Sequence, residues 1–169
     1  MLQTTKATLI PTSGSAVTRS ADVCNNAGNN QVINSTEGVL YAEISALAND
    51  GTSRRIAISD GGYSNRIYLE FDEVSNRIFF TIISGGNSYF IIYTSFDLTI
   101  SSKIALKYKF NDMALWFNGI KVGENTTAIM PVNLSELSFD DGGNTSKFYG
   151  NIKDVRVYNT ALTDAELQA

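Results

Sequence analysis

Three short loops carry the residue types that bind sugars. Each loop combines two adjacent glycines with short polar side chains, and the loops span residues 59–65, 84–89 and 140–146. Carboxylates and amides hold sugar hydroxyls, and an aromatic ring packs against the C–H face of a sugar ring. The predicted carbohydrate-binding residues are the tyrosines and polar side chains of these loops: Asp60, Tyr63, Asn65, Asn87, Tyr89, Asp141 and Asn144. The alternative is that the Asp-Gly-Gly and Gly-Gly-Asn segments only form hairpin turns.

The residue types that are missing exclude several kinds of active site. The sequence has no His and one Cys, Cys24, which rules out Ser-His-Asp and Cys-His nucleophiles, His-based metal sites and an intrachain disulfide. We expect Cys24 to be buried and inert, and an interchain contact is the alternative. The 13 basic and 17 acidic residues give a net charge of −4. Because the basic residues are scattered, we expect no nucleic-acid partner.

The beginning of the chain reads as an arm followed by a domain. It lacks the apolar run of a signal peptide, and no segment approaches the ~20 apolar residues of a membrane span. Both observations fit a virion component, which is released by lysis. Pro11 and Gly14 interrupt any regular pattern near the start. We therefore expect residues 1–13 to form an arm or linker and residues 14–169 to form one domain.

From Glu37 onward, hydrophobic residues alternate with polar ones. The alternation places Ile67, Leu69 and Phe71 on one face, and it places Ile104, Leu106, Tyr108 and Phe110 on the inner face of another strand with Lys103, Lys107 and Lys109 outside. This period of two is typical of half-buried antiparallel strands. Asn118-Gly119 supplies the two positive φ angles of a type I′ hairpin turn. The sequence therefore predicts an all-β sandwich. Its predicted core comprises Ile67, Leu69, Phe71, Ile78, Phe80, Ile104, Leu106, Leu115, Phe117, Ile152, Val155 and Val157.

The stretch GNIKDVRVYNTALTDAEL, residues 150–167, predicts a strand followed by one short helix. Ile152 does not share an alternation with Val155 and Val157, so we expect either a β-bulge near residues 153–154 or a strand that is covered on both faces. Thr163 and Glu166 form the Ser/Thr-x-x-Glu capping box of a helix start. We expect Leu162 and Leu167 to hold this helix on the sandwich as a lid over an open end of the core.

This C-terminal stretch resembles the signature of laminin-G-like and pentraxin-like domains in the concanavalin A-like lectin/glucanase superfamily. The segment LWFNGIKVGE resembles the hairpin that these domains carry upstream. The segments IPTSGSAVTRSADV and EGVLYAEISAL resemble a linker and module of phage tail and head fibre proteins. The resemblance implies a jelly roll of two packed antiparallel sheets. It leaves function open, because this fold hosts lectins, glycosidases and interaction modules.

The resemblance also implies two kinds of site that the sequence fills incompletely. Hydrolases of the superfamily resemble Glu-x-Asp-x-x-Glu; Glu70 and Asp72 match, but Ser75 stands at the third position and Glu73 falls on the opposite face. We therefore expect solvated carboxylates and no catalysis. Calcium is common in relatives, yet Lys153 occupies a position that is often acidic. The remaining oxygen cluster would be Asp140, Asp141 and Asn144, and we assign no metal and no other cofactor.

These observations predict a non-catalytic module on a virion surface, in a phage fibre or a capsid decoration, that binds host-surface carbohydrate. The other expected partners are virion proteins and further copies of this chain, because weak single sites on a particle gain strength from multivalency. The alternative is a purely structural or oligomerisation module of a virion without glycan binding. A glycoside hydrolase is a third, less favoured interpretation.

Overall fold

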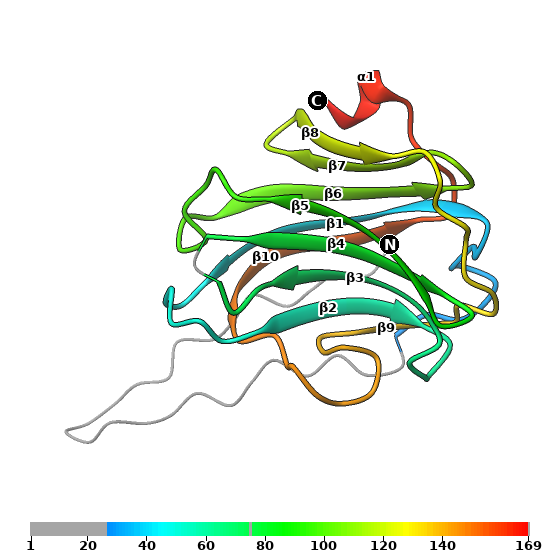
Figure 1. Cartoon of the computed structure of the whole chain (residues 1–169), viewed down its shortest axis with the longest axis horizontal. Helices are drawn as coiled ribbons and strands as arrows, with labels where there is room; N and C mark the ends of the chain where they lie inside the picture. Colours follow the sequence, from blue (N-terminus) through cyan, green and yellow to red (C-terminus); the bar gives the residue numbers. More distant parts are fainter. Residues whose placement is uncertain (1–26, 75, 169) are drawn as a thin grey trace.

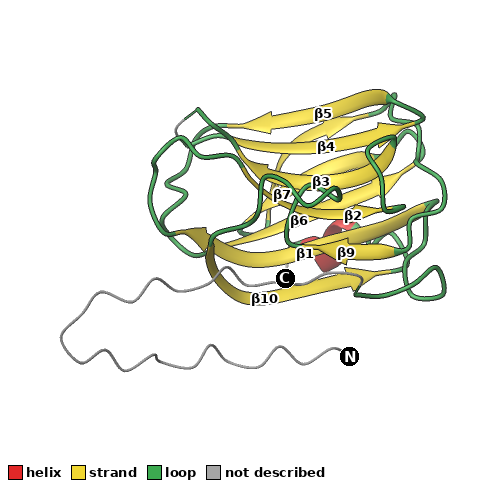
Figure 2. Ribbon diagram, turned by 90° about the horizontal axis from the view of Figure 1, so that it is seen from below, coloured by secondary structure: helices red, strands yellow, loops and turns green. Residues whose placement is uncertain are grey.

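The protein is a sandwich of two antiparallel β-sheets. The computed structural model describes residues 27–74 and 76–168, and in this part of the chain ten strands form two five-stranded sheets that overlie each other (Figure 1). The connecting loops gather at the two ends of the sandwich (Figure 2). The predicted all-β jelly-roll class is therefore confirmed.

We name the sheets A and B and give their strands in spatial order. Sheet A consists of β5 (Asn87–Tyr93), β4 (Ile78–Ser84), β3 (Asn65–Phe71), β2 (Arg54–Ser59) and β9 (Glu136–Ser138). Sheet B consists of β10 (Gly150–Tyr158), β1 (Glu37–Ala46), β6 (Ser102–Lys109), β7 (Met113–Phe117) and β8 (Ile120–Asn125). The helix α1 (Asp164–Leu167) ends the described chain.

The core fills the space between the two sheets, as the alternation predicts. Nine of the predicted core residues are buried: Ile67, Leu69, Phe71, Ile78, Phe80, Ile104, Leu106, Leu115 and Phe117. The other three, Ile152, Val155 and Val157, are partly buried because they belong to β10, at the edge of sheet B. The prediction for Phe110 is wrong, since its side chain is 62% exposed. Strand β6 ends at Lys109 and the chain turns there, so the alternation stops before Phe110.

A β-bulge interrupts β10 at the predicted place. Glu43 faces Asp154 across the β1–β10 ladder, whereas the next residue, Ile44, faces Ile152. Lys153 is therefore the extra residue, and its ammonium bonds the Glu43 carboxylate at 2.5 Å. The bulge explains how Ile152 and Val155 both reach the inner face despite their odd spacing. The type I′ turn is also confirmed, with φ of 49° at Asn118 and 78° at Gly119.

Helix α1 begins with the predicted capping box. The Thr163 hydroxyl accepts from the Glu166 amide, and the Glu166 carboxylate accepts from the Thr163 amide at 2.8 Å. The predicted position of the helix is wrong, however, because α1 lies on the outer face of sheet B and does not cover an end of the core. Leu167 packs there in a second apolar cluster with Val39, Ala105, Ala114 and Trp116, and Leu162 borders the cluster. Lys107, on the outer face of sheet B, lies beneath α1, and its ammonium pairs with the Asp164 carboxylate at 3.6 Å.

The predictions for the arm, for the boundary between residues 13 and 14, and for Cys24 all concern residues 1–26. These residues lie outside the described part of the chain. Within the described ranges, no helix is long and apolar enough to cross a membrane.

Truncation of Leu106 should show how strongly the inter-sheet core stabilises the fold. Leu106 is fully buried, so Leu106→Ala should lower the free energy of unfolding by about 2–5 kcal/mol through lost burial and a cavity. Urea unfolding followed by circular dichroism measures this loss. The exposed Ile129→Ala is the matched control, and a Leu106→Ala loss no larger than that of the control would contradict the assigned facing.

Candidate functional site

The three predicted loops meet at one end of sheet A. The Tyr63 hydroxyl donates to the Gly143 carbonyl at 3.1 Å, which joins the first loop to the third. The Asn65 side chain accepts from the Gly85 amide at 3.2 Å, which joins the first loop to the β4–β5 turn. Three segments that are distant in sequence therefore form one continuous loop surface.

Most polar groups on this loop surface already serve the loops themselves. The Asp60 carboxylate accepts from the Gly62 amide at 3.0 Å and from the Asn65 side chain at 3.1 Å. The Asp141 carboxylate accepts from the Gly143 and Thr145 amides and from the Thr145 hydroxyl. Asn87, Asn144 and Tyr63 remain exposed, Tyr63 by 52%. The loops thus offer two amides and one half-exposed ring to a ligand.

Tyr89 points away from the loop surface. Its ring packs against the core between the sheets, as do Ile91 and Tyr93 on the same strand. The neighbouring Phe90 faces outward instead and is 54% exposed. The alternation along β5 therefore places Phe90, and not Tyr89, on the open side of sheet A.

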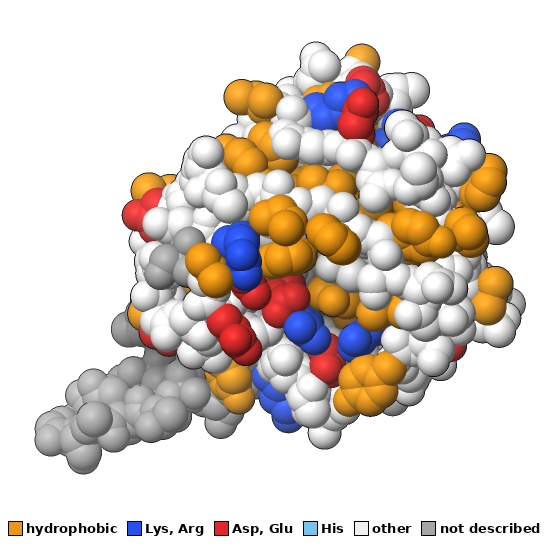
Figure 3. All heavy atoms as spheres, in the orientation of Figure 1, with side chains coloured by type: hydrophobic (Ala, Val, Ile, Leu, Met, Phe, Trp, Pro, Cys, Tyr) orange, Lys and Arg blue, Asp and Glu red, His pale blue; other side chains and the backbone are white. Residues whose placement is uncertain are grey.

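The outer face of sheet A is occupied by paired charges. The Arg55 guanidinium bonds Glu70 at 2.9 Å, and the Arg66 guanidinium lies 3.7 Å from the Asp141 carboxylate. Both guanidinium groups also lie over the Tyr68 ring, at 4.8 and 5.1 Å from its centroid. These charged side chains gather over β2 and β3, whereas apolar side chains cover β4 and β5 (Figure 3). Their mutual pairing uses much of this face for stability.

The two carboxylates considered for hydrolysis belong to such pairs. Glu70 is buried and bonded to Arg55 and to the Ser53 hydroxyl at 2.6 Å. Asp72 is paired with Arg77. The expectation that these carboxylates are solvated is therefore wrong, because Glu70 is covered by Arg55 of β2 and Asp72 is paired with Arg77 in the turn between β3 and β4.

The residues considered for calcium do not fit a cation. Burial alone would raise the pKa of the Asp141 carboxyl, but hydrogen bonds from Thr145 and Gly143 and the charge of Arg66 outweigh burial and hold that pKa below its usual value. Those same donors occupy the oxygens that a metal would need. Among residues 27–74 and 76–168, no group of three or more acidic or thiol side chains could hold a metal ion.

A groove of about 400 Å³ lies on the outer face of sheet B, beside α1. Its aromatic residues are Tyr41 from β1, Trp116 from β7 and Tyr158 from β10. Charged side chains from β1, β6 and β10 form its polar part: Glu43, Lys103, Asp154 and Arg156. The C-terminal segment supplies the remaining wall through Leu162, Glu166 and Leu167. We call this the sheet B groove.

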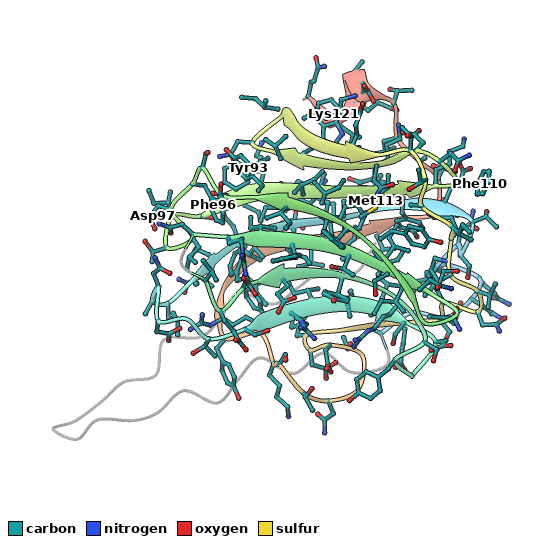
Figure 4. All side chains as sticks on the ribbon, viewed as in Figure 1. Tyr93, Phe96, Asp97, Phe110, Met113 and Lys121 are labelled. Atoms are coloured by element: carbon teal, nitrogen blue, oxygen red, sulfur yellow. The ribbon has the colours of Figure 1, made fainter. Side chains whose placement is uncertain are left out.

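Several groups in the sheet B groove have fixed positions. Arg156 bonds Asp154 at 2.6 Å and lies 5.8 Å from the Tyr41 ring centroid. Burial and the nearby Glu43 carboxylate raise the pKa of Tyr41, so its hydroxyl stays protonated and able to donate. Lys121, labelled in Figure 4 below α1, lies 5.9 Å from the Trp116 ring and pairs with Asp164 at 3.4 Å. These contacts hold the aromatic rings and the helix in place.

Two donors in the sheet B groove have no partner among the described residues. Trp116 is only 3% exposed, and its indole N–H finds no acceptor there. The Lys103 side chain is exposed and forms no ion pair within the described part of the chain. The indole N–H is itself buried, so the ammonium of Lys103 is the one of these two donors that a ligand in the groove can reach.

The sheet B groove was not predicted from the sequence, because no contiguous motif marks it. The available signal was the type of residue at the outward-facing positions of strands β1 and β10. Tyr41 and Glu43 alternate with the core residues Leu40, Ala42 and Ile44, and Arg156 and Tyr158 alternate in the same way along β10. Aromatic and charged residues on the face opposite the core were the sign of a second functional surface.

The low pKa of Asp141 predicts a pH-dependent contribution to stability. Because the folded pKa lies below the ordinary value of 3.8, the ionised carboxylate stabilises the fold above that pH, and the contribution is lost as the pH falls through the folded pKa. Asp141→Asn should therefore lower the free energy of unfolding by about 1–3 kcal/mol at pH 7, and the difference from wild type should shrink as the pH falls below 3.8. Urea unfolding across this range tests it, with the exposed Glu73→Gln as control. An equal loss at every pH would show that shape, and not charge, carries the effect.

Several solved structures share this fold. The Ruminococcus gnavus IT-sialidase CBM40 bound to α2,3 sialyllactose is 14% identical, with a TM-score of 0.68, over 89% of this chain and 95% of that one. Domain 4 of AbnA, a GH43 extracellular arabinanase from Geobacillus stearothermophilus, in complex with arabinotriose, is 13% identical, with a TM-score of 0.67, over 83% and 68%. The leech intramolecular trans-sialidase is 16% identical, with a TM-score of 0.63, over 80% of this chain, but this chain spans only 23% of that enzyme.

At these identities the likeness concerns the fold. No curated protein sequence matches this chain. The family profile of the concanavalin A-like lectin/glucanases superfamily matches residues 26–168, a range that includes all the described residues. The chain therefore belongs to the concanavalin A-like lectin/glucanase superfamily.

Proposed function

We propose that this domain binds carbohydrate without cleaving it, and that the sheet B groove is the binding site. The observation that carries the proposal is the combination, in one groove, of three aromatic residues with the exposed Lys103, which forms no ion pair among the described residues. The groove volume of about 400 Å³ lies within the ~300–1,000 Å³ that is usual for small-ligand sites.

The groove matches the two surfaces of a sugar. The rings of Tyr41 and Tyr158 offer apolar faces to the C–H side of a pyranose or furanose ring. The Tyr41 hydroxyl and the Lys103 ammonium offer donors to its oxygens. The sialyllactose and arabinotriose bound to two proteins of the same fold lend this proposal support.

A binding role fits the groove better than hydrolysis. Glu43 and Asp154 face each other across the β1–β10 ladder and both line the groove. Glycoside hydrolysis needs one such carboxyl group to carry a proton for the leaving group. Here Lys153 engages Glu43 at 2.5 Å and Arg156 engages Asp154 at 2.6 Å. We therefore assign these carboxylates to positioning the cations and the ligand.

We also propose that the domain works in many copies on a virion surface, in a phage fibre or capsid decoration, where it contacts host-surface glycans. The resemblance of residues 10–23 and 37–47 to a linker and module of phage fibre proteins supports this setting. Copies on one particle would raise avidity by about 10²–10⁴, which compensates for a shallow site. A purely structural virion module is the alternative, and it predicts no glycan binding at any valency.

Removal of the Tyr41 ring should weaken glycan binding. A glycan array probed with a streptavidin-tethered tetramer of this domain identifies ligands, and Tyr41→Ala should reduce the affinity for them about tenfold. Tyr149→Ala removes an exposed tyrosine outside the groove and should leave binding unchanged. No binding of the wild-type tetramer to any glycan would favour the structural alternative, and release of reducing sugar from a bound glycan would contradict the non-catalytic assignment.

The loop surface around Tyr63 is a second candidate site, favoured by the half-exposed Tyr63 ring beside Asn87 and Asn144. If the groove is the site, Tyr63→Ala should leave the array profile and the affinities unchanged within about twofold. Tyr63→Phe separates the ring from its hydroxyl bond to Gly143. A loss of binding in Tyr63→Ala that Tyr63→Phe does not share would assign the sugar to the loops.

A further inference from the structure

A second hollow, of about 850 Å³, lies at one end of the sandwich. Its walls come from the segment before β1, from the loop before β9 and from the single residues that follow β2 and β10. Side-chain amides dominate its polar surface, with one carboxylate: Asn30, Gln31, Asn34, Asn133, Asn159 and Asp60. We call it the amide hollow.

Four of these amides are uncommitted. The side chains of Asn30, Gln31, Asn133 and Asn159 form no hydrogen bond to another residue within the described ranges. An amide offers two donors and an acceptor with two lone pairs, which is the mixture that neighbouring hydroxyl groups require. The carboxylate of Asp60 already accepts from Gly62 and Asn65, so the hollow presents little free charge.

The amide hollow adjoins the sheet B groove at the end of β10. Tyr158 lines the groove and the next residue, Asn159, lines the hollow; consecutive Cα atoms are about 3.8 Å apart. At the start of β1, Thr36 lines the hollow and Val39 lines the groove. The Asn34 side chain donates to the Asn159 carbonyl at 3.0 Å, which ties these two segments together. At both places the residues that line the groove and the hollow are thus close in the chain.

We infer that the amide hollow is a second subsite for the same glycan chain, and that the domain recognises oligosaccharides longer than a disaccharide. This inference rests on the proposed function of the groove. In the sheet B groove, the aromatic rings pack against the faces of one or two sugar rings. In the amide hollow, the uncommitted amides bind hydroxyl groups of the next, uncharged sugar units. The ligand class is therefore a glycan that continues into neutral residues beyond the unit held in the groove.

Chain-length dependence tests the inference. The probes are arabino-, galacto- and gluco-oligosaccharides of two to eight units, together with sialyllactose, measured by calorimetry on the whole chain. The test variant combines Asn133→Gly with Asn159→Ala; glycine suits position 133 because φ is 60° there, and the Asn159 carbonyl bond is kept. Asn111→Gly, at a φ of 56° and outside both hollows, is the matched control.

For the wild type and the Asn111→Gly control, affinity should rise about tenfold from two to five units, and the double variant should lose that gain while keeping its disaccharide affinity. The inference would be overturned if affinity did not change with the number of sugar units. The proposed function would still stand in that case, provided that Tyr41→Ala weakened disaccharide binding. An equal loss for short and long chains in the double variant would also overturn the inference. Failure of every probe to bind would overturn both proposals.

Discussion

The antiparallel pairing of β10 with β1 is the interaction on which the rest of the molecule depends. It runs from Val39 opposite Tyr158 to Ala46 opposite Gly150, with one bulge at Lys153. On the inner face it brings Val155 and Val157 against the core. On the outer face it sets Arg156 and Tyr158 beside Tyr41, and it delivers the chain to α1 over Trp116. Core, groove and helix position thus follow from one strand pair.

The two outer faces of the sandwich are used differently. On sheet A, Arg55 pairs with Glu70 and Arg66 pairs with Asp141 over the Tyr68 ring, so this face stabilises the fold. On sheet B, Tyr41, Trp116 and Tyr158 line an open groove, and the exposed Lys103 forms no ion pair among the described residues. A buried pair consumes the charges that a ligand would need, which is why the less committed face is the better candidate for recognition.

The fold followed from the sequence because burial of one strand face imposes a period of two. Ile67, Leu69 and Leu106 stand in that period and are buried, and the capping box placed the start of α1. The same reasoning could not orient strand β5. Its sequence, NSYFIIY, has apolar residues on both faces of the strand, so the alternation did not predict that Tyr89 faces the core. Local turn chemistry also competes with ligand binding for the same residue types, and Asp60 and Asp141 turned out to serve their own loops. The groove depends on Tyr41, Trp116 and Tyr158, which only the sheet pairing brings together.

The position of Trp116 allows the central claim to be tested directly. It is the one tryptophan of the chain, and it lines the groove, so its fluorescence reports on this site. The decisive measurement is a titration with an array-identified glycan, followed both by tryptophan emission and by calorimetry. Binding in the groove predicts a saturable change in emission whose midpoint equals the calorimetric Kd. Calorimetric binding that leaves the emission and acrylamide quenching of Trp116 unchanged would contradict the account.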